Sequence, residues 1–167
     1  MNKLLAGAFA AVVALVGTVS VADIVGPNPM SQTLSVTTLA TSCSFSVPVT
    51  GTMPYDEPNA QFTSVGGTAA TMNITYRELT TLNIVNDGVF DGKSDAITDI
   101  DYTGTTFDGN AFTNGATGSL AASVTLTSSG ALQIGELSLL PTSMDVALAQ
   151  IDDYGNYPTS FTVTCVE

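Results

Sequence analysis

The 167-residue sequence has no histidine, no tryptophan and only three lysine and arginine residues, against 15 aspartate and glutamate residues. Without histidine, neither a Ser-His-Asp nor a Cys-His catalytic arrangement can be built, because both use an imidazole as the base. Zinc sites of the usual nitrogen and sulfur type are also excluded, since the two cysteines alone do not complete a ligand set. The shortage of basic side chains excludes a patch that binds nucleic acid or phosphate.

Other enzyme signatures are missing as well. The sequence contains no glycine-rich phosphate loop and no dinucleotide-binding fingerprint. Hydrolysis by a pair of carboxylates stays open in principle, but the acidic residues lie in polar segments without the aromatic platforms of sugar-cleaving clefts. We therefore predict that the protein is not an enzyme and holds no cofactor, with calcium as the one exception weighed below.

The first 22 residues have the form of an export signal. Lys3 precedes an apolar run from Leu4 to Val16, and small residues before Asp23 suit cleavage after Ala22. The alternative is a retained anchor like that of type IV pilins. The run is short for a span of ~20 residues, and two prolines soon after it would interrupt a long helix. We predict a signal peptide over 1–22 and a product at the cell surface or outside the cell.

Loss of the signal makes the chain more acidic. Arg77 and Lys93 then oppose 15 acidic residues, so the net charge becomes −13. Such a surface repels nucleic acid and anionic lipid. No second apolar run is long enough to span a bilayer, so we expect contact with a membrane only during export.

The composition favours strands and turns. Serine, threonine, glycine, valine and alanine dominate, whereas lysine, arginine and glutamate are scarce. Roughly eight to ten short segments with alternating apolar residues predict a single all-β domain. We predict an antiparallel β-sandwich, Ig-like or jelly-roll-like, over residues 40–167, without internal repeats.

The clearest local patterns define the predicted elements. Near 142–152 a short helix is slightly favoured, although Met144, Val146 and Leu148 fit a strand equally well. Two Asp-Gly pairs after Val85 indicate a loop. The other predicted elements are strands at Cys43–Thr50, Ala70–Tyr76 and Leu79–Val85, a loop at Asn86–Asp95, an edge strand at Ile97–Tyr102, a long loop or weak hairpin at Gly104–Gly118, and a hairpin over Leu120–Leu140.

The two cysteines are predicted to form a disulfide. Export leads to an oxidising compartment, and an even count favours one bridge. Alternation places Cys43 on the same face as Phe45 and Val47, and Cys165 on the same face as Val163, so both thiols point inward. A Cys43–Cys165 bridge would join the first core strand to the last. The chain-entropy model assigns such a long loop roughly 5 kcal/mol.

An acidic cluster is the only candidate metal site. Asp87, Asp91, Asp95, Asp99 and Asp101 lie close together in the sequence, and oxygen-rich loops hold calcium outside cells. The spacing lacks the glycine and glutamate positions of an EF-hand. The cluster is therefore either a calcium site centred on Asp87, Asp91 and Asp95 or a solvated, turn-rich loop.

Two features raise the possibility of glycans. Asn73-Ile74-Thr75 is an N-glycosylation sequon, and alternation points Asn73 away from Met72 and Ile74, toward solvent. Tyr154 and Tyr157, in the segment DDYGNYP, are candidates for stacking on sugars. The alternative for these tyrosines is that they cap the end of the sandwich.

The segment from Asp23 to Leu39 is predicted to be an extended tail. Prolines exclude a regular helix near its start, and from Thr33 onward Leu34 and Val36 face one way. A tail of this kind can add as a strand to a neighbouring subunit and bury its apolar residues there. The alternative is that Thr33–Thr38 pairs with its own sheet.

In organisation the chain resembles secreted pilus and filament subunits of the donor-strand type, including archaeal pilins and spore-coat-like β-sandwich proteins. The shared features are the export signal, the extended tail, the β-rich body and the cysteine pair. Chaperone–usher pilins differ, because their bridge usually ties two early strands. The resemblance implies a self-polymerising subunit of a filament, pilus or surface layer. The alternatives are a monomeric secreted adhesin or carbohydrate-binding module, and a surface-anchored accessory protein without a ligand.

Overall fold

The computed structural model describes residues 29–38, 43–79, 81–90, 96–115, 119–127, 130–147 and 157–167. These residues are mostly β, and they contain two short 3-10 helices, η1 (Glu57–Asn59) and η2 (Tyr102–Gly104), but no α-helix. The prediction of an all-β chain is therefore confirmed at the level of fold class. In the same ranges, no helix is long and apolar enough to cross a membrane. The predicted signal and residues 23–28 lie outside the described residues.

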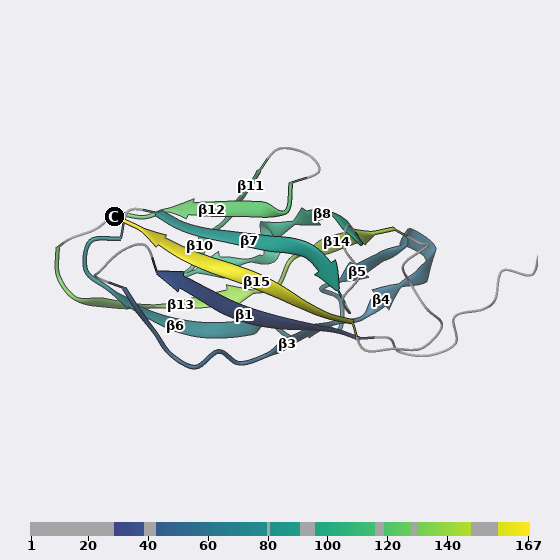
Figure 1. Ribbon diagram of the computed structural model, residues 1–167, viewed down its shortest axis with the longest axis horizontal. Coiled ribbons are helices and arrows are strands. Elements are labelled where there is room, and N and C mark those ends of the chain that lie inside the picture. The colour runs from purple at the N-terminus through teal and green to yellow at the C-terminus, as the bar shows by residue number, and fades with distance from the viewer. Residues whose placement is uncertain are drawn as a thin grey trace, which may run out of the picture.

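The largest sheet has six strands and contains both the first and the last strand of the chain (Figure 1). Strand β1 runs parallel to β15, and the other neighbours are antiparallel. The order is β11 (Thr113–Asn114), β12 (Ala121–Thr125), β7 (Thr81–Phe90), β15 (Tyr157–Val166), β1 (Met30–Thr38) and β3 (Gly51–Met53).

Two smaller sheets complete the fold. The five-stranded sheet has the order β10 (Asn110–Ala111), β9 (Thr106–Phe107), β13 (Gln133–Leu139), β6 (Ala70–Tyr76) and β2 (Ser44–Phe45). The four-stranded sheet has the order β4 (Tyr55–Asp56), β5 (Gln61–Thr63), β14 (Ser143–Val146) and β8 (Ile97–Asp101). Strand β6 matches its predicted range, and β8 lies at a sheet edge as predicted.

All three sheets contribute to one hydrophobic core. Alternate residues of β6 and β15 are buried, as the two-residue period of a strand requires. Phe161 and Val163 from β15, Ile74 from β6 and Met144 from β14 all belong to the same buried cluster. The segment before β6 joins two of the sheets, because β3 pairs with β1 while Thr52 also bridges to Thr68.

Strand β7 is longer than predicted. It continues to Phe90 because Asn86 and Gly88 form a bulge instead of starting a loop. Gly88 adopts φ +73°, which favours glycine, and its N–H donates to Asn86 Oδ1 at 2.8 Å. The Asn86 amide in turn donates to Thr159 Oγ1 at 2.9 Å, so the buried polar side chain is paired. The Asp-Gly pair has the chemistry of a turn, but here it bends a strand and does not end it.

Two other predictions were wrong. Leu120–Leu140 is not a hairpin, because β12 pairs with β7 and β11, whereas β13 pairs with β6 and β9 in another sheet. The favoured helix near 142–152 is contradicted over Ser143–Val146, which forms β14 between β5 and β8. Met144 and Val146 are both buried there, so the two-residue period prevails. Residues 148–152 lie outside the described ranges.

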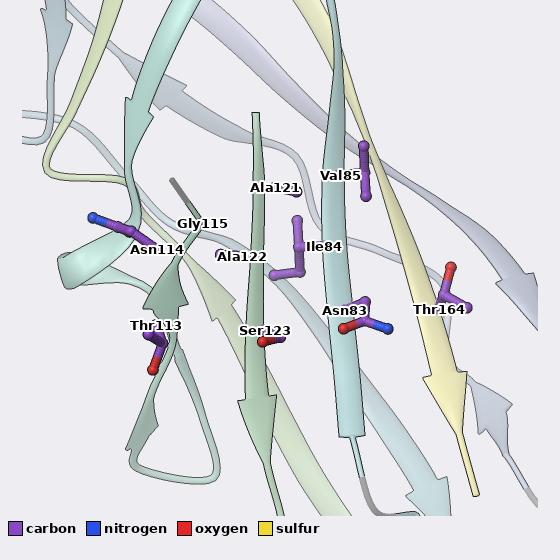
Figure 2. A pocket seen from close by; sticks show the side chains of 10 residues that line it. All are labelled: Asn83, Ile84, Val85, Thr113, Asn114, Gly115, Ala121, Ala122, Ser123 and Thr164. Carbon is purple, nitrogen blue, oxygen red and sulfur yellow. The ribbon is translucent and has the colours of Figure 1, made fainter. Parts of the chain in front are cut away.

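The outward face of the six-stranded sheet carries a shallow trough of about 370 Å³ (Figure 2). Small side chains on β12 form its floor, because Ala121 and Ser123 leave room that larger residues would fill. Side chains from β11, β7 and β15 line the rest, including Thr113, Asn83, Val85 and Thr164.

Candidate functional site: strand β1 and its groove

Strand β1 lies in its own sheet. It pairs with β15 over nine consecutive residues, from Met30 beside Tyr157 to Thr38 beside Cys165. The alternative that the tail pairs within its own chain is therefore what the structure shows. The strand also begins earlier than predicted, because the segment before Thr33 already belongs to the ladder.

The inward face of β1 completes the core. Met30 is fully buried and Leu34 is 7% exposed, whereas Val36, farther along the same face, is 39% exposed. The prediction that Leu34 and Val36 share a face fits the strand period, but only Leu34 is buried. The core residue Met30 was missed because its neighbours Pro29 and Gln32 made the segment look like an irregular tail.

Hydroxyl groups on the outward face tie β1 to β15. Thr33 Oγ1 donates to the carbonyl oxygen of Thr159 at 3.1 Å. Ser35 Oγ lies 3.3 Å from the Phe161 carbonyl oxygen and 3.4 Å from Thr162 Oγ1. These contacts support the parallel register, because each hydroxyl reaches its paired residue on β15 or the residue just before it.

The opposite edge of β1 is only partly covered. Strand β3 pairs with Met30, Ser31 and Gln32 alone. Within the described residues, no strand pairs with the edge of Thr33–Thr38 that faces away from β15. More than half of β1 is therefore held from one side only.

Among the β1 side chains that the structure describes, over residues 30–36, Gln32 is the one buried polar residue on the inward face. It is 0% exposed, and neither its side-chain nitrogen nor its side-chain oxygen has a hydrogen-bond partner. A buried amide without partners costs about 1–3 kcal/mol for each unsatisfied group. The residue therefore weakens the packing of β1 against the core. The sequence contains a signal for this burial, because Gln32 lies between Met30 and Leu34 in the every-second-residue pattern of the inward face.

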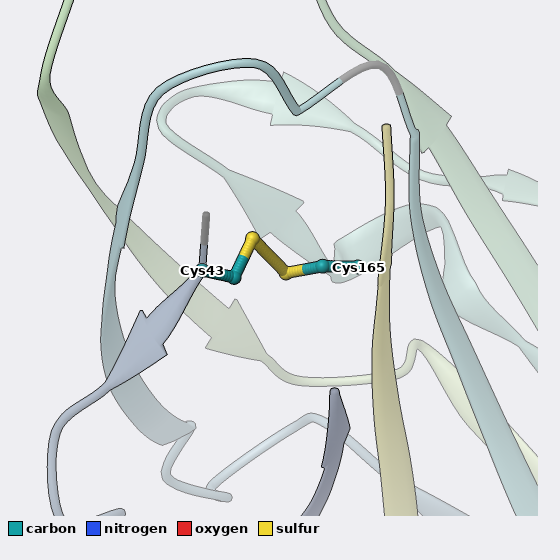
Figure 3. The surroundings of a disulfide bond; sticks show 2 residues. All are labelled: Cys43 and Cys165. Atoms are coloured by element: carbon teal, nitrogen blue, oxygen red, sulfur yellow. A yellow bond between two sulfur atoms is a disulfide. The ribbon is translucent and has the colours of Figure 1, made fainter. Parts of the chain in front are cut away.

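The disulfide closes the fold just beyond β1. Cys43 and Cys165 are bonded, with their Cα atoms 6.7 Å apart, so this prediction is confirmed (Figure 3). Cys165 is fully buried in β15, and Cys43 is half-buried just before β2. The prediction failed for Val47, which is 88% exposed, because β2 ends at Phe45 and Pro48 cannot donate to a ladder.

The disulfide separates the chain into a covalently closed loop and a strand that lies outside this loop. Thr38 pairs with Cys165, and Cys43 is bonded to that same residue, so both ends of 39–42 lie beside Cys165. Everything from Cys43 to Cys165 belongs to one covalent loop. Strand β1 lies outside that loop and is connected to it only through the chain preceding Cys43.

The acidic cluster is only partly described. Asp87 is exposed on β7, where its Oδ1 accepts the N–H of Val89 at 3.1 Å. Asp91 and Asp95 lie outside the described residues. In the part of the chain that the structure describes, no three acidic or cysteine side chains form a group that could hold a metal. Calcium binding stays a prediction.

Of the candidate glycan-contacting residues, too, only some are described by the structure. Tyr157 is 1% exposed and its ring lies 5.8 Å from that of Phe62, so it is not available to stack on a sugar. Tyr154 lies outside the described residues. Asn73 is exposed on β6 as predicted, with its backbone N–H donating to Ser46 Oγ at 2.9 Å. Glycosylation of Asn73 stays a prediction.

Comparisons with known proteins add no further guide. No family model, no curated protein and no solved structure matches the chain. Function therefore has to be inferred from the geometry of β1, β15 and the disulfide.

Proposed function

We propose that the chain is a structural subunit of an extracellular filament, pilus or surface layer, whose copies assemble by exchanging β1. One observation carries the proposal. Strand β1 pairs with β15 over nine residues and buries Met30 and Leu34 in the core, yet it lies outside the covalent loop between Cys43 and Cys165. It is the part of the core that can leave while the rest of the molecule stays closed.

Exchange would conserve the contacts that β1 makes. A donated β1 meets the same β15 and buries the same Met30 and Leu34 in the acceptor, so the exchanged and closed forms have similar energies per strand. Mass action then favours assembly at high subunit concentration. The disulfide keeps the acceptor groove in place while it is empty, since it holds Cys43 against β15.

Gln32 would act on the rate of exchange. Its buried amide lacks partners in the closed form and would meet the same neighbours in the exchanged form. It therefore weakens both states equally and leaves their balance unchanged. Because it lowers the cost of removing β1 from its groove, it should speed the step in which the strand leaves.

A sandwich arrangement of the sheets is part of the same proposal. We infer that the six-stranded and five-stranded sheets act as the two layers of a β-sandwich around the shared core. Removing β1 from such a sandwich exposes an edge of β15 and an apolar groove between the layers, which is the kind of site that accepts an added strand.

Engineered crosslinks test the exchange. Ser35 and Thr162 lie opposite each other on β1 and β15, with their hydroxyl oxygens 3.4 Å apart. A Ser35→Cys/Thr162→Cys variant, oxidised after assembly of the mature chain, should give a ladder of covalent multimers on a non-reducing gel. The same variant oxidised as a monomer should give a closed monomer.

The matched control places both cysteines inside the covalent loop. Thr75 and Ile134 are neighbours on β6 and β13, so Thr75→Cys/Ile134→Cys should crosslink within one chain under both conditions. Polymers whose Ser35→Cys/Thr162→Cys crosslinks are all intramolecular would overturn strand exchange. A mature chain that never polymerises at high concentration would overturn the filament proposal altogether.

The alternative function is that of a monomeric secreted adhesin or carbohydrate-binding module. Burial of Tyr157 removes one member of its proposed stacking pair. A stable monomer that binds glycans through other residues would favour this alternative over the filament subunit.

A further inference from the structure

The outward face of the six-stranded sheet carries no charged side chain across its central strands. Most outward positions of β1, β15, β7 and β12 in the described ranges carry hydroxyl or amide side chains, and Val85 and Ala121 are apolar exceptions. Asp87, beyond the Asn86 bulge, and Glu167, at the chain end, lie only at the borders. We define this hydroxyl face by the residues Thr33, Ser35, Thr162, Thr164, Asn83 and Ser123.

Absence of charge is unusual for this chain, which has a formal net charge of −12 with its first residues included. The acidic residues gather elsewhere. Asp56, Asp99, Asp101 and Asp145 lie on the four-stranded sheet, and Glu136 lies on β13. Two copies of such a chain repel each other in most relative orientations. The hydroxyl face is where that repulsion is weakest, because it presents no carboxylate at its centre.

The face also contains an exposed apolar side chain beside a recess. Val85 is 45% exposed on β7, although its outward neighbours along β7 and on β15 are polar. It lies opposite Ala121 in the ladder, at the margin of the trough floored by Ala121 and Ser123 (Figure 2). When two such faces meet about a two-fold axis, the Val85 side chain of each copy can enter the trough of the other.

We propose that a second copy of this chain packs on the hydroxyl face, with Val85 of each copy seated in the trough of its partner. Hydroxyl groups both donate and accept hydrogen bonds, so a surface rich in serine and threonine is complementary to itself. A basic partner would instead be drawn to the acidic surfaces. The contact goes beyond strand exchange, because β1 completes the same face whether it is the chain's own or donated.

The size of the face predicts a weak contact. Four strands at ~4.8 Å spacing and about seven residues at ~3.3 Å each cover roughly 20 by 23 Å. That is on the order of 500 Å², below the ~800 Å² per partner of a standard stable interface. We therefore expect a reversible dimer of isolated chains. In a filament, many copies of this contact along the length would together hold two neighbouring rows of subunits more strongly.

Sedimentation equilibrium of the mature chain tests the proposal, over a wide range of protein concentration. Val85→Asp adds a carboxylate at the centre of the face and should weaken dimerisation by about tenfold or more. Its matched control is Ile134→Asp, which adds the same charge at an exposed strand position, 68% exposed on β13 in the other sheet. The control should dimerise like the parent chain, apart from a small effect of added charge.

Salt sharpens the test. Added salt screens the repulsion between acidic copies, so dimerisation through an uncharged face should strengthen with ionic strength. A contact held by ion pairs would weaken instead. The proposal fails if the parent chain stays monomeric at the highest protein and salt concentrations. It fails equally if Val85→Asp dimerises like the parent, or if Ile134→Asp loses dimerisation to the same extent.

Resistance to detergent separates this proposal from strand exchange. A dimer through the hydroxyl face should dissociate on dilution and in SDS, whereas copies joined by exchanged β1 strands should survive both for long periods. A reversible dimer that depends on Val85, without resistant polymers, would support the face and remove the exchange. Resistant polymers without a reversible dimer that depends on Val85 would support strand exchange and overturn the proposal for the hydroxyl face.

Discussion

Strands β1 and β6 have similar amphipathic patterns, but they are secured very differently. β6 is flanked on both sides, by β13 over seven residues and by β2 and Val49 on its other edge, and it lies inside the disulfide loop. Its inward residues are all apolar. β1 is held from one side over most of its length, lies outside the loop and carries Gln32 inward. The comparison separates a covalently closed body from a strand that is held mainly by its pairing with β15.

Loss of the disulfide should have the largest effect, because it loosens the body itself. The Cys43→Ala/Cys165→Ala variant should lose about 3–5 kcal/mol of unfolding free energy, measured by urea denaturation. Deleting residues 29–38 while keeping the bridge should leave a folded body. If the deletion unfolded the chain and the double alanine variant did not, the distinction between body and strand would be wrong.

Core truncations compare the two strands directly. Ile74→Ala in β6 should cost about 4 kcal/mol, because the residue is fully buried between two paired edges. Leu34→Ala in β1 should cost about 2 kcal/mol, because the open edge lets the site collapse. Chemical denaturation of both variants gives the two values. Equal losses would mean that β1 is as firmly built into the core as β6.

Replacing the unpaired amide should stabilise β1. Gln32→Met keeps the shape of the side chain and removes two unsatisfied buried atoms, so unfolding free energy should rise by about 1–2 kcal/mol. Strand exchange, measured by the appearance of intermolecular crosslinks, should become slower. Gln61→Met, at a half-buried position on β5, is the control and should change stability by less than about 0.5 kcal/mol. A destabilised Gln32→Met variant would mean that the amide is satisfied in solution.

The smallest effect concerns the outward hydroxyls. Ser35→Ala removes the contacts with Phe161 and Thr162 and should cost no more than about 1 kcal/mol, since the Ser35 side chain is exposed to water. Hydrogen exchange of the β1 amides should accelerate more than that of the β6 amides. Uniform acceleration across both strands would show that the two unfold together.

Local patterns predicted which residues are buried better than they predicted which strands are neighbours. The period of two in β6 and β15 identified the faces of Ile74 and Val163, and with them the disulfide. The same period cannot tell which sheet a strand joins. Ser128-Ser129-Gly130 therefore looked like a hairpin turn, although the strands on either side of it belong to different sheets.

The parts of the candidate site that were missed have the same cause. Gln32 falls at an inward position of the alternating pattern of β1, but a polar side chain at such a position is normally taken to mark the end of a buried strand. Val85 has the phase of an outward residue, and an apolar side chain there marks a surface contact only once the trough beside it is known. Both depend on contacts between segments far apart in the chain, which alternation along one segment does not contain.

The parallel direction of β1 and β15 has a consequence for growth. Met30 lies at one end of the ladder and Thr38 at the other, beside Cys165. If subunits exchange β1 as proposed, donated strands that keep this direction would enter every acceptor from the same end, so all copies in a row would point the same way. Such a row would end in a subunit with an unfilled acceptor groove at one side and in a subunit with an undonated β1 at the other. Its two termini are chemically unlike, and they should elongate at different rates.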